Sequence, residues 1–351
     1  MEKQRKNQLE DMVAPLLDWY AQNARALPWR RDREPYHVWV SEIMLQQTRV
    51  EAVRGYYARF LAALPDIETL ANCPEERLMK LWEGLGYYQR ARNLQKAAQE
   101  VMARYGGVFP GEYAAIRALA GIGDYTAGAI ASICFGKATP AVDGNVLRIM
   151  ARLTDCHAEV DSPAVRRDFC ARLQKVYPAD AAGAFTQALM ELGACLCVPR
   201  VPRCLACPVR EYCEGFALGT HAALPVRKAK RARRVETRTV FLLYTEEKLA
   251  LQKRPQEGLL AGMWELPASL GALSAEQALS QARAWGLDPV TIEKTLHHVH
   301  VFTHIEWHMT CHVIGVAKET GAFTWATREA LGEAYALPSA FRPFLADFLD
   351  R

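Results

Sequence analysis

Four cysteines lie close together in one short, proline-rich segment, CVPRVPRCLACPVREYC, with the spacing C-x6-C-x2-C-x5-C. They are Cys197, Cys204, Cys207 and Cys213. Thiols at this density favour a metal centre over disulfides, because the chain shows no secretion signal and is expected in a reducing compartment. Only the middle pair has the C-x2-C spacing of a zinc ribbon, so an iron–sulfur cubane fits better, although the spacing leaves zinc open.

Two carboxylates have surroundings that suit acid–base chemistry. Glu42 lies in VWVSEIMLQQT, among apolar residues at helical spacing, and is expected to be partly desolvated. Burial raises the pKa of a carboxyl group and lets it hold a proton near neutral pH. Asp143, in AVDGNV, precedes a predicted helix, where aspartate commonly serves only as an N-cap. One protonated and one ionised carboxyl group form the pair that cleaves a glycosidic bond.

The stretch IRALAGIGDYTAGAIA, residues 116–131, predicts two helices joined by a tight turn. Gly121 and Gly123 permit the turn, and the second helix is expected to begin near Asp124. Exposed N–H groups at such a helix start, together with the helix dipole, suit a phosphate oxygen. A contact of this kind fixes position on a nucleic acid without reading its sequence. An ordinary turn between two helices is the alternative.

These residues must be positioned by a chain of 351 residues, half of them hydrophobic, with a net charge of +4. Its length indicates two or three domains, and the sequence shows no apolar run long enough to span a membrane. Helical periodicity dominates residues 1–220. A basic run, RKAKRARR, follows at residues 227–234, within a linker placed at 221–235 that could also contact phosphate. Alternating, β-branched segments then predict an α+β domain over residues 236–351.

In combination these motifs resemble the endonuclease III superfamily of DNA glycosylases. Within it, SEIMLQQT, PWR at 28–30, LGYY at 85–88 and the additional C-terminal domain are similar to the MutY-type adenine glycosylases. The resemblance implies a multidomain fold, with an all-α helix-hairpin-helix glycosylase domain carrying an iron–sulfur loop at 197–213, and an α+β Nudix-like domain. It also implies a [4Fe-4S] cluster on the four cysteines.

The resemblance assigns further roles residue by residue. Glu42 would protonate the adenine, and Asp143 would stabilise the cationic sugar by its charge or as a transient covalent partner. Tyr125 and Asn145 would support them, although Tyr125 could simply pack under the hairpin. No lysine lies between Lys96 and Lys137. The amine nucleophile of the bifunctional branch is therefore missing, and base removal by water is expected. Contacts to the extruded adenine or to the base stack are implied for Arg30, Gln47, Tyr87 and Gln187.

The C-terminal part resembles the Nudix fold through RPQEGLLAGMWELP, residues 254–267. Its helix carries a single acid, Glu276, and not the acidic cluster that binds Mg²⁺ in a Nudix hydrolase, which favours recognition over hydrolysis. By resemblance, a short loop reads the base opposite the adenine. The matching residues here are Phe302, Thr303 and His304, with His300 upstream, and threonine replaces the serine of the family.

The sequence therefore predicts a monofunctional DNA glycosylase of base excision repair that removes adenine mispaired with 8-oxoguanine or guanine. The expected partner is double-stranded DNA bound by a monomer, in the cytoplasm and at a bacterial-type nucleoid. A bifunctional lyase for damaged pyrimidines is disfavoured by the missing lysine. A non-catalytic DNA-binding scaffold is disfavoured by the presence of both Glu42 and Asp143.

Overall fold

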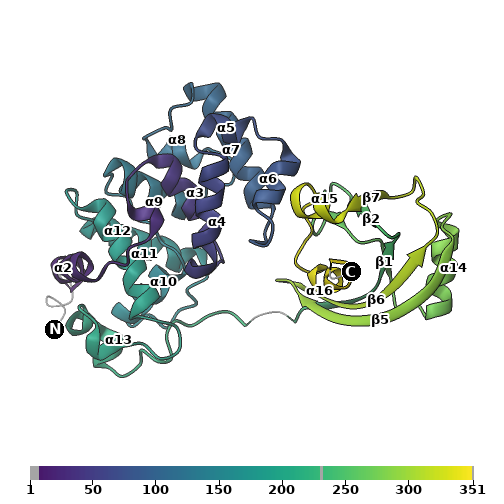
Figure 1. Ribbon diagram of the computed structural model, residues 1–351. Helices are drawn as coiled ribbons and strands as arrows, with labels where there is room; N and C mark the ends of the chain where they lie inside the picture. The colour runs from purple at the N-terminus through teal and green to yellow at the C-terminus, as the bar shows by residue number, and fades with distance from the viewer. Residues whose placement is uncertain (1–7, 230–231, 350–351) are drawn as a thin grey trace. The chain divides into compact units, whose positions relative to one another are not determined.

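Helices follow one another through the first two thirds of the chain in the computed structural model, which describes residues 8–229 and 232–349 (Figure 1). The elements are α1 (Gln8–Asp11), α2 (Val13–Asn23), η1 (Pro28–Arg30), α3 (Pro35–Leu45), α4 (Val50–Ala63), α5 (Ile67–Ala71), α6 (Glu75–Leu81), α7 (Gln89–Tyr105), α8 (Tyr113–Arg117), α9 (Asp124–Phe135), α10 (Gly144–Leu153), α11 (Pro163–Val176), α12 (Ala182–Cys195), η2 (Cys204–Ala206), η3 (Arg210–Tyr212) and α13 (Glu214–Ala217). Among the helices of the described chain, none is long and apolar enough to cross a membrane.

Two compact units divide the described residues: 8–72 with 92–229, and 73–91 with 232–349. The short segment 73–91, which includes α6, groups with the second unit. Within that unit Lys80 donates hydrogen bonds from Nζ to the carbonyls of Leu331 and Tyr335. The division at 221–235 inferred from the sequence stays a prediction. Lys230 and Arg231 of the basic run lie outside the described residues.

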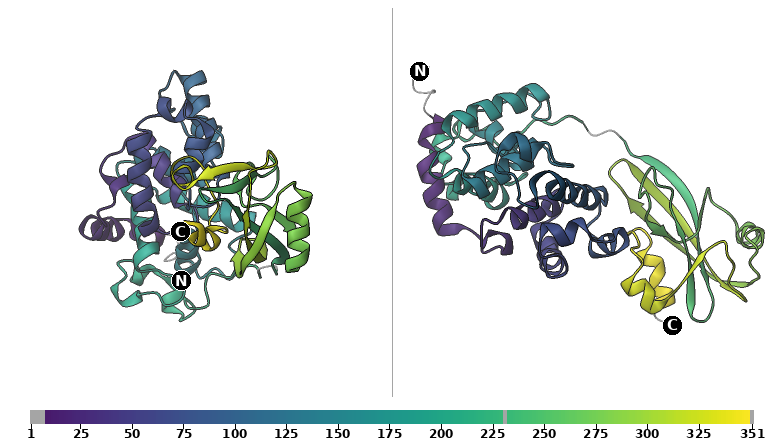
Figure 2. Two further views of the ribbon diagram at one scale, coloured as in Figure 1. Left: turned by 45° about the vertical axis from the view of Figure 1, so that its right-hand side comes forward. Right: turned by 90° about the horizontal axis from the view of Figure 1, so that it is seen from above.

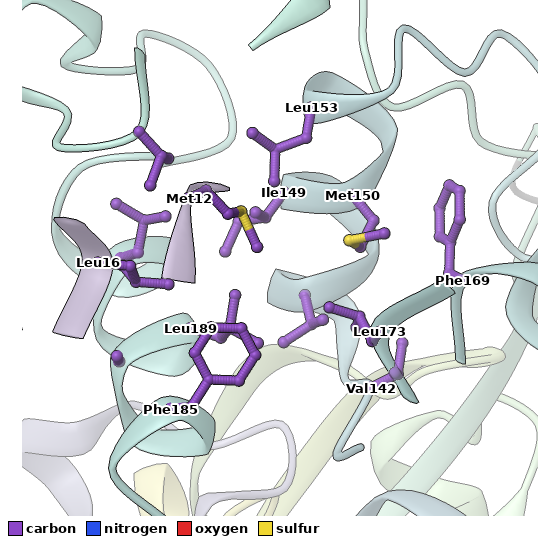
Figure 3. Close-up of a cluster of buried hydrophobic side chains, with 14 of the residues drawn as sticks. Met12, Leu16, Val142, Ile149, Met150, Leu153, Phe169, Leu173, Phe185 and Leu189 are labelled. Atoms are coloured by element: carbon purple, nitrogen blue, oxygen red, sulfur yellow. The ribbon is translucent and has the colours of Figure 1, made fainter. Parts of the chain in front are cut away.

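The core of the first unit fixes α10 against α12. Ile149, Met150 and Leu153 on α10 and Phe185 and Leu189 on α12 belong to one cluster of buried side chains (Figure 3). Burying each such side chain contributes roughly 1.5–3 kcal/mol. The cluster thereby holds the N-terminus of α10 at a set position beside α12, and residues for a site on these two helices come from one rigid block.

Two glycines bring backbone segments into close approach. Gly121 has φ +72°, and a Cβ atom there would lie 2.6 Å from the Cβ of Asn93. The hairpin thus requires glycine both for its left-handed conformation and for space. At Gly128, in the middle of α9, a Cβ atom would lie 2.3 Å from the carbonyl oxygen of Pro140. Its absence lets the segment leading to Asp143 pack directly on α9.

A mixed β-sheet forms the body of the second unit. Its strands are β1 (Arg234–Tyr244), β2 (Lys248–Lys253), β3 (Trp264–Glu265), β4 (Ala268–Leu270), β5 (Pro289–Val301), β6 (Ile305–Val316) and β7 (Thr324–Thr327). The order is β3-β2-β1-β6-β5, with β4 beside β1 and β7 beside β2. β1 and β6 run parallel with Val240 opposite Cys311, whereas β5 pairs antiparallel with β6.

Helices cover both faces of this sheet (Figures 1 and 2). One face packs on α14 (Ala275–Ala284) through Ala278 and Ala282. The other packs on α15 (Arg328–Glu333) and α16 (Arg342–Leu349), where Phe344 and Phe348 are buried. The alternating stretch from His298 to Gly315, read from the sequence as strand, is divided between β5 and β6 by a turn at 302–304.

Candidate active site and cysteine pocket

One cavity of about 740 Å³ opens in the helical unit. Residues from η1, α3, the turn before α9, the N-terminus of α10 and α12 form its wall. Both acids predicted from the sequence line it, although they come from distant parts of the chain. The predicted site residues that share this wall are Arg30, Glu42, Gln47, Gly121, Gly123, Tyr125, Asp143, Asn145 and Gln187.

Glu42 is a buried acid with one strong hydrogen bond. It is 5% exposed, because α3 is buried without interruption from residue 38 to 44. The hydroxyl of Tyr125 donates a 2.6 Å hydrogen bond to its Oε2. Burial, reinforced by repulsion from Asp143, raises the pKa of Glu42 to about 7, while the Tyr125 bond and the charge of Arg30 oppose the rise. Near neutral pH this carboxyl group can therefore both hold and release a proton.

Asp143 caps helix α10. Its Oδ1 accepts hydrogen bonds from the backbone N–H groups of Asn145 at 2.9 Å and Val146 at 2.8 Å, and its Oδ2 accepts one from Nδ2 of Asn145 at 2.8 Å. Burial raises the pKa of Asp143, and these three bonds oppose the rise because they favour the charged form. Asp143 is thus an N-cap, and the cap fixes its carboxylate at the cavity wall.

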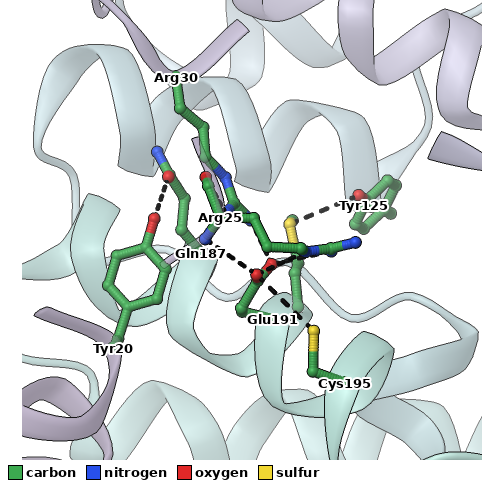
Figure 4. Close-up of polar contacts among 8 residues, drawn as sticks. Tyr20, Arg25, Arg30, Tyr125, Gln187, Glu191 and Cys195 are labelled. Atoms are coloured by element: carbon green, nitrogen blue, oxygen red, sulfur yellow. Dashed lines mark hydrogen bonds and ion pairs between the residues drawn. The ribbon is translucent and has the colours of Figure 1, made fainter. Parts of the chain in front are cut away.

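Two arginines and a third acid also line the cavity (Figure 4). Glu191 on α12 is fully buried and pairs with Arg25 at 2.6 Å and with Arg30 at 2.8 Å. Burial disfavours its charge, but the hydrogen bonds from both arginines outweigh this and lower the pKa of Glu191 to about 2. Beside it, the hydroxyl of Tyr20 donates to Oε1 of Gln187, and the Arg30 guanidinium lies 5.6 Å from the centre of the Tyr20 ring.

Glu191 and Arg25 were not among the residues singled out from the sequence, although both line the cavity. A signal for Glu191 does exist. It stands among apolar residues in FTQALMELGAC on α12, as Glu42 does on α3. An acid with apolar helical neighbours is buried, and a buried acid needs a charged partner or a proton. Arg25 lies in a polar stretch with no such pattern, so only the fold reveals it as the partner.

The remaining predicted DNA-binding residues belong to the second unit and are not among the residues that line this cavity. In that unit Thr303 and His304 form part of the turn between β5 and β6. The hydroxyl groups of Tyr87 and Thr303 are 2.9 Å apart and share a hydrogen bond. The rings of His300 and Phe302 lie 4.6 Å apart, edge to face. These contacts place aromatic rings and hydroxyl groups at the turn between β5 and β6.

All four clustered cysteines line one small pocket of about 30 Å³ in the helical unit, formed by the loop after α12 together with α10. Arg152, 2% exposed, donates to the sulfur of Cys197 at 3.3 Å and to the carbonyls of Val198 and Pro199. Among the described residues, no three His, Cys, Asp or Glu side chains are grouped so that they could hold a metal ion.

A second arginine connects this loop with Asp143 through Asn145. Arg148, one helical turn before Arg152, donates from Nε to the carbonyl of Cys197 at 2.7 Å and from Nη2 to Oδ1 of Asn145 at 2.9 Å. Asn145 in turn bonds Asp143. The loop and the catalytic candidate therefore share a hydrogen-bonded path along α10.

Fold and cavity together define a helix-hairpin-helix glycosylase with a Nudix-like second unit. The family model described as "HhH-GPD superfamily base excision DNA repair protein" matches residues 40–175, and a "NUDIX domain" model matches residues 239–347. The structure of a thermostable thymine-DNA glycosylase resembles 60% of this chain and 98% of its own, with a TM-score of 0.56 and 27% identity. The predicted fold class is confirmed.

Relatives narrow the class to one family. The adenine DNA glycosylase of Arabidopsis thaliana is 36% identical over 86% of this chain, which spans 56% of that relative's length. The adenine DNA glycosylase of Mus musculus is 35% identical over 83% of this chain and 68% of its own length. The chain belongs to the adenine DNA glycosylase family. The family predicted from the sequence is confirmed.

Proposed function

We propose that this protein removes adenine mispaired with 8-oxoguanine or guanine from double-stranded DNA by hydrolysing the N-glycosidic bond. One observation carries the proposal: Glu42, with its pKa near 7, and the capped carboxylate Asp143 face the same cavity. The cavity, of about 740 Å³, can accept one nucleotide. A base inside a duplex cannot reach such a cavity, so the adenine must first be extruded from the stack.

The two acids then divide the chemistry between them. Glu42 donates its proton to a ring nitrogen of adenine, and the electrons of the breaking C–N bond pass to the base. Positive charge develops on the sugar, where the Asp143 carboxylate stabilises it. Water adds to the sugar, and the carboxylate left on Glu42 takes up the proton that this water loses. The products are free adenine and an abasic site in the DNA strand.

Water is the proposed nucleophile because an amine is missing at the cavity. The lining residues, all within the described part of the chain, include arginines but no lysine. An arginine stays protonated at any ordinary pH and cannot attack the sugar. The enzyme is therefore proposed to be monofunctional, without an efficient lyase step.

Reading of the base opposite the adenine is proposed for Phe302, Thr303, His304 and His300, with Tyr87 entering the base stack. Support comes from the hydroxyl and ring groups that the turn between β5 and β6 presents in one place. A hydroxyl can donate to or accept from a purine edge, and an aromatic ring can replace lost stacking.

An iron–sulfur cluster is proposed for the cysteine pocket. Four thiols line a common space beside the buried guanidinium of Arg152, which favours negative charge on sulfur. The spacing C-x6-C-x2-C-x5-C differs from the paired spacing of a zinc ribbon and fits a [4Fe-4S] cluster held by Cys197, Cys204, Cys207 and Cys213. When bound, the cluster would brace the loop at 197–213.

A single-turnover assay tests the function. Duplexes carrying adenine opposite 8-oxoguanine, guanine or thymine are incubated with excess protein, and free adenine and abasic sites are measured. We expect rapid release opposite 8-oxoguanine, slower release opposite guanine and none opposite thymine. Borohydride should trap little covalent adduct. Equal release from all three duplexes would contradict the proposed specificity, and efficient trapping would indicate a lyase.

A further inference from the structure

Two arginines add positive charge to the wall of the cavity. Arg25 and Arg30 both reach the cavity that contains Glu42 and Asp143. Guanidinium groups remain charged at all accessible pH values, and a carboxylate is their strongest partner. With nothing to hold it, Arg30 would be drawn to the two reacting acids. It would then neutralise the charge that the sugar needs and ionise the acid that adenine needs.

A third carboxylate prevents this by binding the arginines first. Oε1 of Glu191 accepts from the backbone N–H and the Nε of Arg25, and Oε2 accepts from Nη2 of both arginines. The Glu191 side chain is fully buried, and that of Arg30 is 13% exposed. Figure 4 shows both arginines reaching Glu191, with Tyr125 nearby.

We propose that Glu191 is a positioning residue that confines Arg30 to the α12 side of the cavity and thereby keeps Glu42 protonated and Asp143 unpaired. Glu191 touches neither adenine nor sugar in this proposal and acts through Arg30. The inference rests on the proposed function, because it supplies the condition under which Glu42 can serve as the acid.

The charges around Glu42 set the expected direction. The ionisable groups that face it or line its cavity come from several elements: Arg25, Arg30, Asp124, Tyr125, Cys134, Asp143, Arg166, Cys170 and Glu191. Arg30 already lowers the pKa of Glu42, although burial outweighs it. Removing the charge of Glu191 frees Arg30 to approach Glu42, so the field at Glu42 becomes more positive. Glu42 must then ionise at lower pH.

The test compares pH–rate profiles of adenine excision under single-turnover conditions. In Glu191→Gln the alkaline limb should move down by roughly one pH unit, so that the rate at pH 7.5 falls about tenfold. Glu191→Asp, which keeps the charge, should restore most of the rate. In an Arg30→Met background the Glu191→Gln change should no longer move the limb. The proposal is overturned if the alkaline limb stays in place in Glu191→Gln. It is also overturned if Glu191→Gln moves the limb equally in the Arg30→Met background.

A second pair of variants guards against misfolding, since Glu191→Gln removes the charged partner of two half-buried arginines. Arg25→Met and Arg25→Met/Glu191→Gln differ only at Glu191, and the double variant removes one charge of each sign. The alkaline limb of the pH–rate profile should stay in place in the single variant and move to lower pH in the double variant. Equal limbs in the two variants would contradict the inference.

A measurement without substrate separates this inference from the proposed function. The protonated carboxyl of Glu42 can be titrated in the free protein by infrared difference spectroscopy and assigned by its loss in Glu42→Gln. Its midpoint should lie near 7 in the unaltered protein and lower in Glu191→Gln. If the protein releases no adenine but the midpoint shifts, the proposed function fails and the role of Glu191 stands. If adenine is released but the midpoint does not move, only the inference fails.

Discussion

The hydroxyl of Tyr125, on α9, donates a 2.6 Å hydrogen bond to Oε2 of Glu42, on α3. The bond uses one carboxyl oxygen, so the other can carry the proton of the neutral acid. It also sets the acid strength of Glu42, because a donor favours the ionised form and partly offsets the effect of burial. Tyr125 therefore adjusts the acid strength of Glu42, the proposed general acid, and does more than pack under the hairpin.

Replacing Tyr125 by phenylalanine should raise the pKa of Glu42 above 7. The alkaline limb of the excision profile should then move to higher pH by roughly one unit, because the group that favoured ionisation is gone. Tyr177→Phe is a matched control. Tyr177 is also buried but bonds Thr186 in the core, so its loss should leave the limb in place. A downward shift in Tyr125→Phe would contradict this role of the bond.

Glu42→Gln should abolish excision and yet stabilise the protein at alkaline pH. The folded-state pKa of about 7 exceeds the ordinary value of 4.5. The stabilising contribution of Glu42 is therefore fully present below about pH 4.5 and is lost as pH rises through 7. Above that, the buried ionised carboxylate costs about 3 kcal/mol. Thermal melts should show a higher Tm for the variant at pH 8.5 and little advantage at pH 4.5.

A Glu42→Gln variant that is less stable at both pH values would show that ionisation of the buried carboxyl group does not destabilise the folded protein. The acid assignment would then lose its physical basis. Binding to a duplex that holds an adenine mispair provides the companion measurement. It should persist in Glu42→Gln, because the substitution removes a proton donor and leaves the cavity shape and the arginines intact.

Asp143→Asn separates the charge of Asp143 from its capping role. Asparagine caps helices about as well as aspartate and can still accept from the N–H groups of Asn145 and Val146. Unfolding free energy should change by less than about 1 kcal/mol, whereas excision should fall about 10²–10³-fold because the developing sugar cation loses its counter-charge.

Ser162→Ala is the opposite control. Ser162 caps α11 by accepting from the N–H of Val165, and its loss should cost about 1 kcal/mol of stability without changing excision. If Asp143→Asn leaves excision intact, the carboxylate is a cap and nothing more.

Much of the site could be predicted from the sequence because its signals are local. Glu42 stands out as an acid among apolar helical neighbours, and α9 begins at Asp124, where the glycines of the hairpin placed it. Asp143 precedes a glycine and an amphipathic stretch, which marks a helix start. Each signal needs only a few neighbouring residues, so no tertiary information is required to recognise it.

Features that depend on long-range pairing could not be predicted in this way. The partner of Glu191 is Arg25, which is far from it in the sequence. No sequence pattern around Arg25 indicates this pairing. The parallel pairing of β1 with β6 joins segments that have similar alternation to several others, so alternation alone cannot select the partner. The grouping of 73–91 with the second unit likewise depends on contacts, such as Lys80 with Leu331, between residues far apart in the chain.

Cys204→Ser should empty the cysteine pocket of its metal. The purified protein should hold four iron atoms per chain and absorb broadly in the visible range, and the variant should lose both properties, because one missing thiolate leaves an iron without its protein ligand. Cys156→Ser is the matched control: Cys156 is half-buried and lies outside the lining of the pocket, so iron content should stay unchanged. Proteolysis should also cut the variant faster within 197–213, where the loop loses its brace but Arg148 and Arg152 still hold the carbonyls at 197–199. One zinc ion per chain in place of iron would contradict the cluster assignment.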